Sequence, residues 1–309
     1  MKRVLVLRLS ALGDVIHTIP AVLMLRDAAR VTWAVEAPYR ELVEIVAGVE
    51  TIPMRLKAWG RAPLAHRGEM GDAFRALRGG FDEAIDFQGL IKSALLMRLS
   101  GAPVRHGFAR EAIREKQAAW FANRRVAVDT SRHVVDQNLE LARAAMPSSA
   151  VLRPPSAGWS SFAQNRDLGD FAGAVVLLPG AGKPSKLWPA ESFRELAKRI
   201  GARALAVWGP GERALAEATG ARVAPPTNLR ELAWLLRQAR VVIGGDTGPL
   251  HLADALGTKV IGLYGPTDPR RNGPHGQLER CIDHFRTTKS MRSISVEEVM
   301  TTLEKVEAE

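Results

Sequence analysis

The sequence has a single cysteine, Cys281, and no long apolar run. One cysteine excludes an intrachain disulfide and a metal site built from several cysteines. Only four apolar residues separate Met1-Lys2-Arg3 from Arg8, too few for the apolar core of a signal peptide, which has about 7–15. No run approaches the roughly 18–20 apolar residues of a membrane-spanning helix. We therefore expect a cytoplasmic protein that can still touch a membrane surface.

Common nucleotide and metal fingerprints are also absent. The segment 9–13, after the first predicted strand, lacks the spaced glycines of a dinucleotide site, and no Gly-Lys-Ser or Gly-Lys-Thr phosphate loop occurs. These absences count against an NAD-dependent oxidoreductase and against a phosphate-loop ATPase. The seven histidines show no His-x-x-x-His spacing, so we expect no zinc site.

Acidic residues are too few to balance the basic ones. There are 33 Asp and Glu against 43 Lys and Arg, which gives a formal net charge of +10. Residues 55–125 alone hold 14 basic and 7 acidic residues. A solvated face is the ordinary explanation of a charge run, but confinement to one window favours an anion-binding lobe. Nucleic acid is the weaker partner, because no helix-turn-helix, zinc-finger or aromatic RNA-binding signature accompanies the charge.

The order of predicted strands and helices describes two α/β halves. Apolar strands at about 4–7, 31–35 and 84–87 alternate with helices in the first half. The second half repeats this rhythm, and its strands are predicted at about 174–178, 204–208, 241–243 and 260–263. A stretch rich in proline and serine, residues 146–158, indicates a loop or a linker between the halves. We therefore expect two domains, each a doubly wound parallel sheet.

The loops that follow these strands are the candidate sites, because ligands of doubly wound sheets bind at the carboxyl ends of strands. Asp14 comes at the start of the first helix, where a carboxylate is either a helix cap or a general base. The loops 180–182 and 245–248 precede helix starts, where free amides bind phosphate, although turn chemistry alone also explains such glycines. Possible further phosphate contacts are Lys183, Lys186 and Thr247, while His17 and His251 are more often structural in such positions.

Five segments resemble signatures of the bacterial lipopolysaccharide heptosyltransferases, glycosyltransferase family 9. They occur in family order, at Gly13–Pro20, Asp86–Ala94, Lys186–Pro189, Asp246–His251 and Leu263–Pro269. Five segments in order are far more specific than one glycine loop. The loop Asp246-Thr247-Gly248 is similar to that of the enzymes that add the first heptose, because second-heptose enzymes usually carry an Asn- or Asp-Ser-Gly loop.

The resemblance implies a GT-B architecture, with two Rossmann-like domains facing a central cleft. Residues 1–165 would form the acceptor-binding domain and residues 166–285 the domain that binds ADP-heptose. The final helix, at about 286–309, would pack back on the N-terminal domain.

The resemblance also implies roles for individual residues. Asp14 would be the catalytic base. The donor would be bound by Lys186, Glu212, Asp246, Thr247, Gly248 and His251, and by backbone amides of Ala181 and Gly182, which replace a Thr-Thr pair of the family. The acceptor would be bound by Arg55, Lys57, Arg61, Lys92 and Arg114.

The implied activity is transfer of heptose from ADP-heptose to the Kdo of Kdo2-lipid A, with inversion and without a metal or other cofactor. The protein would act at the cytoplasmic face of the inner membrane, in peripheral contact with it. Another family 9 transferase with a different acceptor, of the second-heptose type, is the nearest alternative. A basic nucleic-acid-binding protein is the alternative that is not an enzyme.

Overall fold

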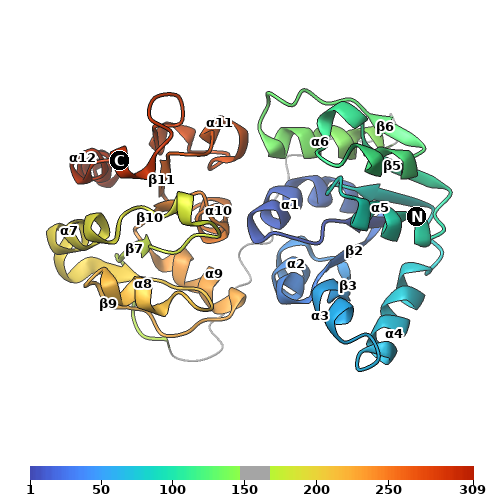
Figure 1. Cartoon of the computed structure of the whole chain (residues 1–309), viewed down its shortest axis with the longest axis horizontal. Coiled ribbons are helices and arrows are strands. Elements are labelled where there is room, and N and C mark those ends of the chain that lie inside the picture. The colour runs from blue at the N-terminus through green and yellow to red at the C-terminus, as the bar shows by residue number, and fades with distance from the viewer. Residues whose placement is uncertain (147–167) are drawn as a thin grey trace. The chain divides into compact units, whose positions relative to one another are not determined.

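The computed structural model describes residues 1–146 and 168–309, which form two compact units, Met1–Ser161 and Phe162–Glu309. Each unit holds a six-stranded sheet in which every recorded pairing is parallel, with helices packed around it (Figure 1). The two predicted doubly wound sheets are therefore confirmed. The expected domain boundary at residues 165–166 and nearly all of the expected linker lie outside the described residues.

The N-terminal sheet has the strand order β3-β2-β1-β4-β5-β6. Its strands are β1 (Arg3–Leu7), β2 (Arg30–Glu36), β3 (Glu50–Met54), β4 (Glu83–Asp86), β5 (Val104–Phe108) and β6 (Arg124–Val126). Its helices are α1 (Leu12–Arg26), α2 (Arg40–Ala47), α3 (Leu56–Arg61), α4 (Arg67–Leu77), α5 (Ile91–Leu99) and α6 (Val134–Ala144), with the 3-10 turns η1 (Ala37–Tyr39), η2 (Arg110–Ala112) and η3 (Lys116–Phe121). The strand order reverses beside β1, so the loops after β1 and β4 lie at a position where such folds bind ligands.

The C-terminal sheet has the equivalent order β12-β11-β10-β7-β8-β9. Its strands are β7 (Val175–Leu178), β8 (Ala204–Ala206), β9 (Arg222–Val223), β10 (Val241–Gly245), β11 (Val260–Tyr264) and β12 (Cys281–Asp283). Its helices are α7 (Ala190–Ile200), α8 (Arg213–Ala218), α9 (Leu229–Gln238), α10 (Gly248–Ala255), α11 (Pro269–Asn272) and α12 (Val296–Ala308), with the 3-10 turns η5 (Pro184–Lys186), η6 (Gly201–Arg203), η7 (Leu278–Arg280) and η8 (Met291–Ser293).

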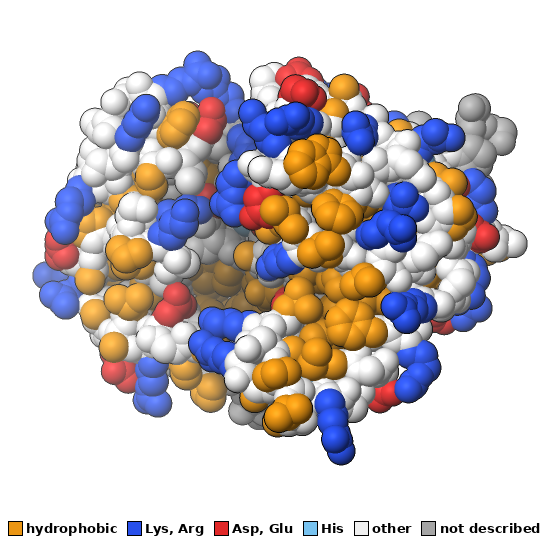
Figure 2. Space-filling model, turned by 45° about the vertical axis from the view of Figure 1, so that its right-hand side comes forward, with side chains coloured by type: hydrophobic (Ala, Val, Ile, Leu, Met, Phe, Trp, Pro, Cys, Tyr) orange, Lys and Arg blue, Asp and Glu red, His pale blue; other side chains and the backbone are white. Residues whose placement is uncertain are grey.

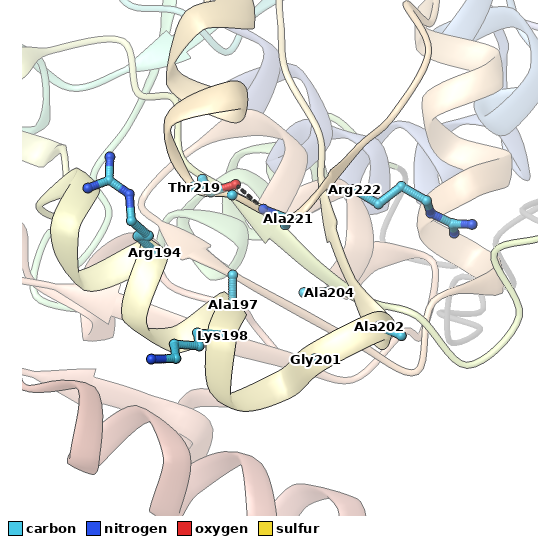
Figure 3. A pocket seen from close by; sticks show the side chains of 10 residues that line it. Arg194, Ala197, Lys198, Gly201, Ala202, Ala204, Thr219, Ala221 and Arg222 are labelled. Atoms are coloured by element: carbon cyan, nitrogen blue, oxygen red, sulfur yellow. Dashed lines mark hydrogen bonds between the residues drawn. The ribbon is translucent and has the colours of Figure 1, made fainter.

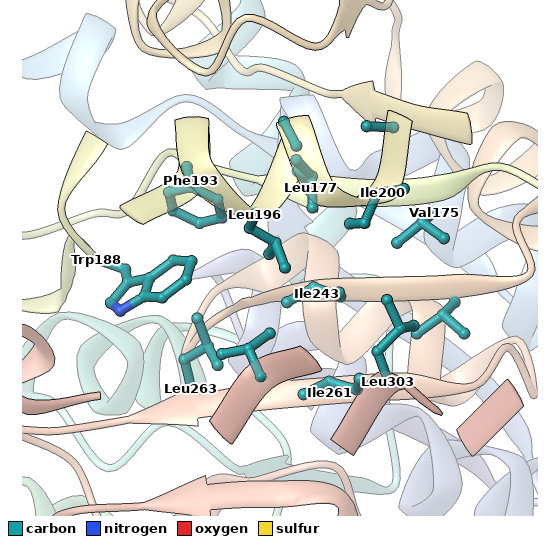
Figure 4. Packing of buried hydrophobic residues seen from close by; sticks show 14 of the residues in the cluster. Val175, Leu177, Trp188, Phe193, Leu196, Ile200, Ile243, Ile261, Leu263 and Leu303 are labelled. Carbon is teal, nitrogen blue, oxygen red and sulfur yellow. The ribbon is translucent and has the colours of Figure 1, made fainter. Parts of the chain in front are cut away.

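The C-terminal helix α12 belongs to the second unit. Its residues Val299, Leu303 and Val306 recur at helical spacing and are at most 2% exposed. They share one apolar cluster with α7 and with the central strands β7, β10 and β11 (Figure 4). Ion pairs from α7 and η6 reinforce this contact, at 2.7 Å between Arg199 and Glu297 and at 2.5 Å between Arg203 and Glu307.

The assignment of this helix to the N-terminal domain is therefore wrong. Its apolar stripe packs on the same face of the C-terminal sheet as α7. Among the helices in the described part of the chain, none is long and apolar enough to cross a membrane.

Candidate functional site

Asp246 is the centre of a polar cluster at the carboxyl edge of the C-terminal sheet. It follows β10 directly, and its side chain is 6% exposed. Lys186 Nζ lies 2.5 Å and Asn272 Nδ2 3.0 Å from Asp246 Oδ2, while His251 Nε2 lies 3.0 Å from Oδ1. Loops and helices after three neighbouring strands, β7, β10 and β11, supply these four side chains. The fold thereby assembles residues that are up to 86 positions apart in the sequence.

The Asp246 carboxylate is held ionised by its partners. Burial raises the pKa of the carboxyl group, but hydrogen bonds and charge from His251 and Lys186 outweigh burial and hold the pKa well below its ordinary range. The side chain of Lys186 stays 22% exposed, so its ammonium group remains accessible to an incoming anion. The structure brings together Lys186, Asp246 and His251, three of the residues expected to bind the donor, and it adds Asn272, which the sequence analysis missed.

The start of α10 presents donors next to this cluster. Thr247 has extended backbone and occupies the position before the helix, and its hydroxyl makes no cap. The Thr247 Oγ1 atom is buried and has no hydrogen-bond partner among the residues that the structure describes. Gly248 begins the eight-residue helix, whose first amides have no partner within the helix. This geometry suits the oxygen atoms of a phosphate.

Glu212 lies at the same edge, against the glycine loop that follows β7. The Gly209 amide donates to Glu212 Oε2 at 3.0 Å. A Cβ atom on Gly180 would lie only 2.2 Å from the same oxygen, so any other residue there would displace the Glu212 carboxylate. Ala181 is half-buried and Gly182 is exposed. Glu212 therefore lies against the start of the loop that contains Ala181 and Gly182.

Asp14 lies at the carboxyl edge of the other sheet, in the first turn of α1. Its Oδ2 accepts a hydrogen bond from the Ala11 amide at 3.3 Å, and its Oδ1 lies 2.8 Å from Arg8 Nη2. The Asp14 side chain is 48% exposed. The carboxylate thus serves the helix start and still reaches solvent, so the cap and the general base are compatible roles.

Arg8 and Asp86 form the buried support beneath Asp14. Arg8 is 8% exposed and also donates a hydrogen bond to the Phe87 carbonyl. Asp86 accepts hydrogen bonds from the Gln88 amide and from Ser93 Oγ. Burial raises the pKa of Asp86 to about 6, and these hydrogen bonds and the charge of Arg8 limit the rise. Sequence reasoning missed Arg8, whose only signal was a charged residue directly after an apolar strand.

The expected acceptor residues gather only in part. Arg55, Lys57 and Arg61 line one open pocket of about 500 Å³ together with Glu36, at the end of β2. Burial raises the pKa of Glu36, and the charge of Lys92 opposes that rise, which places Lys92 within electrostatic reach of the pocket.

Arg114 does not line this pocket. Its side chain is 84% exposed, and its recorded ion pair is with Glu115 at 3.9 Å. The structure thus brings four of the five residues toward one place and leaves Arg114 on the surface after η2.

A second pocket, of about 420 Å³, lies at the amino edge of β8 in the C-terminal unit (Figure 3). Arg194 and Arg222 line it but point in opposite directions (Figure 3), and each donates to a backbone carbonyl. None of the predicted site residues contributes to this pocket. Within residues 1–146 and 168–309, no group of three or more His, Cys, Asp and Glu side chains is arranged to hold a metal ion.

Comparison with known proteins agrees with this geometry. The family model of glycosyltransferase family 9 (heptosyltransferase) matches residues 70–300. Lipopolysaccharide heptosyltransferase 1 of Escherichia coli K12 is 34% identical over 299 residues, which cover 89% of this chain and 91% of that protein.

Two solved structures of the E. coli heptosyltransferase WaaC are similar to this chain along nearly its whole length. The one with ADP has a TM-score of 0.85, and the one with ADP-2-deoxy-2-fluoro heptose has a TM-score of 0.83. Both are 29% identical in sequence and cover 98% of this chain and 99% of their own.

Proposed function

The chain belongs to glycosyltransferase family 9, and we propose that it transfers heptose from ADP-heptose to the Kdo of Kdo2-lipid A, with inversion of the anomeric centre. The observation that carries the proposal is the Asp246 cluster, in which Lys186 lies beside the start of α10, whose first amides suit phosphate oxygens. The solved structure of the E. coli heptosyltransferase WaaC with ADP-2-deoxy-2-fluoro heptose supports an ADP-heptose donor.

Lys186, Thr247 and Gly248 bind the diphosphate of the donor in this proposal. Lys186 turns its ammonium group from Asp246 toward the phosphate, and Asp246 remains held by His251 and Asn272. The Thr247 hydroxyl and the amides at the start of α10 donate hydrogen bonds to the phosphate oxygens. Glu212 accepts from a ribose hydroxyl, and the amides of Ala181 and Gly182 supply the contacts that hydroxyl groups make elsewhere in the family.

Asp14 removes the proton from the attacking Kdo hydroxyl. The hydroxyl oxygen forms a bond to the anomeric carbon while the bond between that carbon and the phosphate oxygen breaks. The electron pair leaves with ADP, and Lys186 with the α10 amides stabilises the growing negative charge. No step requires a metal ion, so we expect full activity in the presence of a chelator.

The basic residues of the N-terminal unit bind the acceptor. Kdo carries a carboxylate and lipid A carries phosphates, so the acceptor is a polyanion. Arg55, Lys57 and Arg61 share one pocket, and Lys92 and Arg114 add positive charge from neighbouring segments. The enzyme would then act at the cytoplasmic face of the inner membrane, in peripheral contact with the membrane.

The test is incubation of the whole protein with ADP-heptose and Kdo2-lipid A, with a chelator present. We expect release of ADP and a gain of one heptose in the mass of the acceptor. Parallel reactions use an acceptor that already carries one heptose, and transfer only to that acceptor would replace the proposal by a second-heptose activity. A nucleic-acid-binding protein would be favoured by a different result. The protein would then bind duplex DNA or RNA whether or not ADP-heptose is present, and it would release no ADP with either acceptor.

A further inference from the structure

Helix α5 of the N-terminal unit presents an apolar stripe to solvent. Ile91, Leu95 and Leu99 are 38%, 44% and 42% exposed. They recur every four residues, while the other side of the helix buries Leu96 and Met97 in the core. Single exposed leucines are common, but three aligned on one short helix leave a continuous apolar strip that costs free energy in water.

Trp120 extends the apolar area beside this helix. It lies on η3, which packs against α5, and it is 66% exposed. With the right-hand side of Figure 1 turned forward, Figure 2 shows hydrophobic side chains gathered in a patch with Lys and Arg side chains at its margins. A tryptophan with its indole in solvent is typical of proteins that bind at membrane interfaces.

Cations flank the stripe on both sides. Because helix residues advance by about 100°, Ile91, Leu95 and Leu99 fall in one arc, with Arg98 on one side of it and Lys92 on the other. Residues 91–125 hold eight Lys and Arg against two Asp and Glu. One of these two acids, Glu115, already accepts a hydrogen bond from the Ile91 amide at 2.7 Å. The apolar strip therefore lies in a strongly positive surround.

The stripe begins at the edge of the sheet that carries Asp14. Ile91 starts α5 directly after β4, and β4 pairs with β1 so that Asp86 lies opposite Leu7. Lys92, which we expect to bind the acceptor, directly follows Ile91 in the sequence. A lipid surface that covers α5 would hold the head group of a membrane-embedded acceptor near this edge.

We propose that Ile91, Leu95, Leu99 and Trp120, with Arg98 and Lys92 beside them, form a surface that docks on an anionic lipid bilayer. This α5 surface combines a central apolar strip with flanking cations, the pattern of helices that lie in the membrane interface. The inference deepens the proposed function, since it assigns the residues that bring the enzyme to its lipid acceptor. It depends on that function only for its biological purpose, because vesicle binding is measured without any acceptor.

Sedimentation with vesicles tests the proposal on the whole chain. We expect binding to vesicles of phosphatidylcholine with phosphatidylglycerol and much weaker binding to phosphatidylcholine alone. Arg98→Ser should weaken binding to the anionic vesicles about fivefold, the effect of one basic residue near such a surface. Leu95→Glu should weaken it more strongly, because it places a charge in the apolar strip. Lys305→Ser, an exposed basic residue of α12, is the matched control and should bind as the wild type does.

Quenching of tryptophan fluorescence by brominated lipids gives a second, independent measurement. Trp120→Phe keeps the apolar ring and should still bind, but it should lose most of the quenching seen with the wild type. Equal binding by wild type and Leu95→Glu would overturn the proposal, and so would unchanged quenching in Trp120→Phe. ADP release with detergent-dispersed acceptor reports on the proposed function separately, because it does not require docking on a bilayer.

Discussion

The guanidinium of Arg8 lies against the carboxylate of Asp14, with Nη2 and Oδ1 2.8 Å apart. Arg8 is the residue directly after β1, and Asp14 lies in the first turn of α1, the helix that follows. The cation is buried, whereas the carboxylate is half exposed. A buried cation thus lies against a carboxylate that still reaches solvent, a position from which the carboxylate can meet a substrate hydroxyl.

Asp14→Asn should lower kcat by about 10²–10⁴-fold, because the amide cannot take a proton from the acceptor hydroxyl. ADP binding should stay close to that of the wild type. Kinetics at saturating donor and calorimetry with ADP provide the two measurements. Asp27→Asn, at the other end of α1 and half exposed, is the control. Wild-type turnover in a folded Asp14→Asn protein would rule out the base.

Arg8→Gln should lower kcat by about 10–100-fold through misorientation of Asp14, with little change in the KM for the donor. Arg8→Lys keeps the charge and should recover part of the loss. A purely structural role predicts something else, namely that both variants lose thermal stability and that the remaining folded enzyme turns over normally. Melting temperatures measured beside kcat distinguish these results.

Asp86 makes the stability of the N-terminal unit depend on pH. Its pKa rises from 3.8 to about 6 on folding, because burial penalises the ionised form. The folded state therefore binds this proton more tightly than the unfolded state does. The resulting contribution to the free energy of unfolding is fully present below about pH 4 and is lost as the pH rises through about 6. Relative to Asp86→Asn, the wild type should lose about 2 kcal/mol of unfolding free energy between pH 4 and pH 7.

Urea unfolding of both proteins across that range measures this difference. Asp72→Asn, which removes an exposed carboxylate on α4, should run parallel to the wild type at every pH. A constant difference between wild type and Asp86→Asn from pH 4 to pH 7 would contradict the assignment.

The sequence predicted most of the inner strands of both sheets and missed all four edge strands. The run Val4–Leu7 is apolar throughout because β1 is covered on both faces. The outer strands β3, β6, β9 and β12 are short or polar, and β3 contains Pro53. An edge strand buries less side-chain surface, so its sequence carries a weaker apolar pattern. The inner strand β5 was also missed, since Arg105 and His106 interrupt its apolar residues.

The sequence predicted those candidate site residues that stand in recognisable motifs. It did not predict those that only tertiary contacts bring to the site. Lys186 and Asp246 stand in recognisable segments, and the fold brings them together across 60 positions. Asn272 carries no pattern of its own, because only the path of the chain after β11 directs it toward Asp246. The same reason explains the error on α12: its amphipathic spacing shows that one face is buried, but not against which sheet.

Gly180→Ala tests the packing of the donor loop. The added methyl group would meet the Glu212 carboxylate, the far end of a flexible side chain that can move aside. We therefore expect little loss of stability. Donor binding should weaken, with a rise of about 5–100-fold in the donor KM, because Glu212 leaves its position. Gly276→Ala is the control, since a Cβ atom there meets nothing within 4 Å. If Gly180→Ala has the donor KM of the wild type, Glu212 does not bind the donor.

Lys186→Ala should affect the donor more than any other single change in the C-terminal unit. Loss of the ammonium group removes the charge that stabilises the leaving diphosphate, so kcat should fall by about 10²–10³-fold and the donor KM should rise. The variant also leaves the buried Asp246 with His251 and Asn272 as its remaining partners, and this change alone could lower stability. Lys186→Arg separates the two effects, because it keeps the pair with Asp246 but displaces the charge. Lys198→Ala, which removes an exposed lysine of α7, is the control. If donor KM and kcat are both unchanged in Lys186→Ala, the phosphate contact assigned to this residue is wrong.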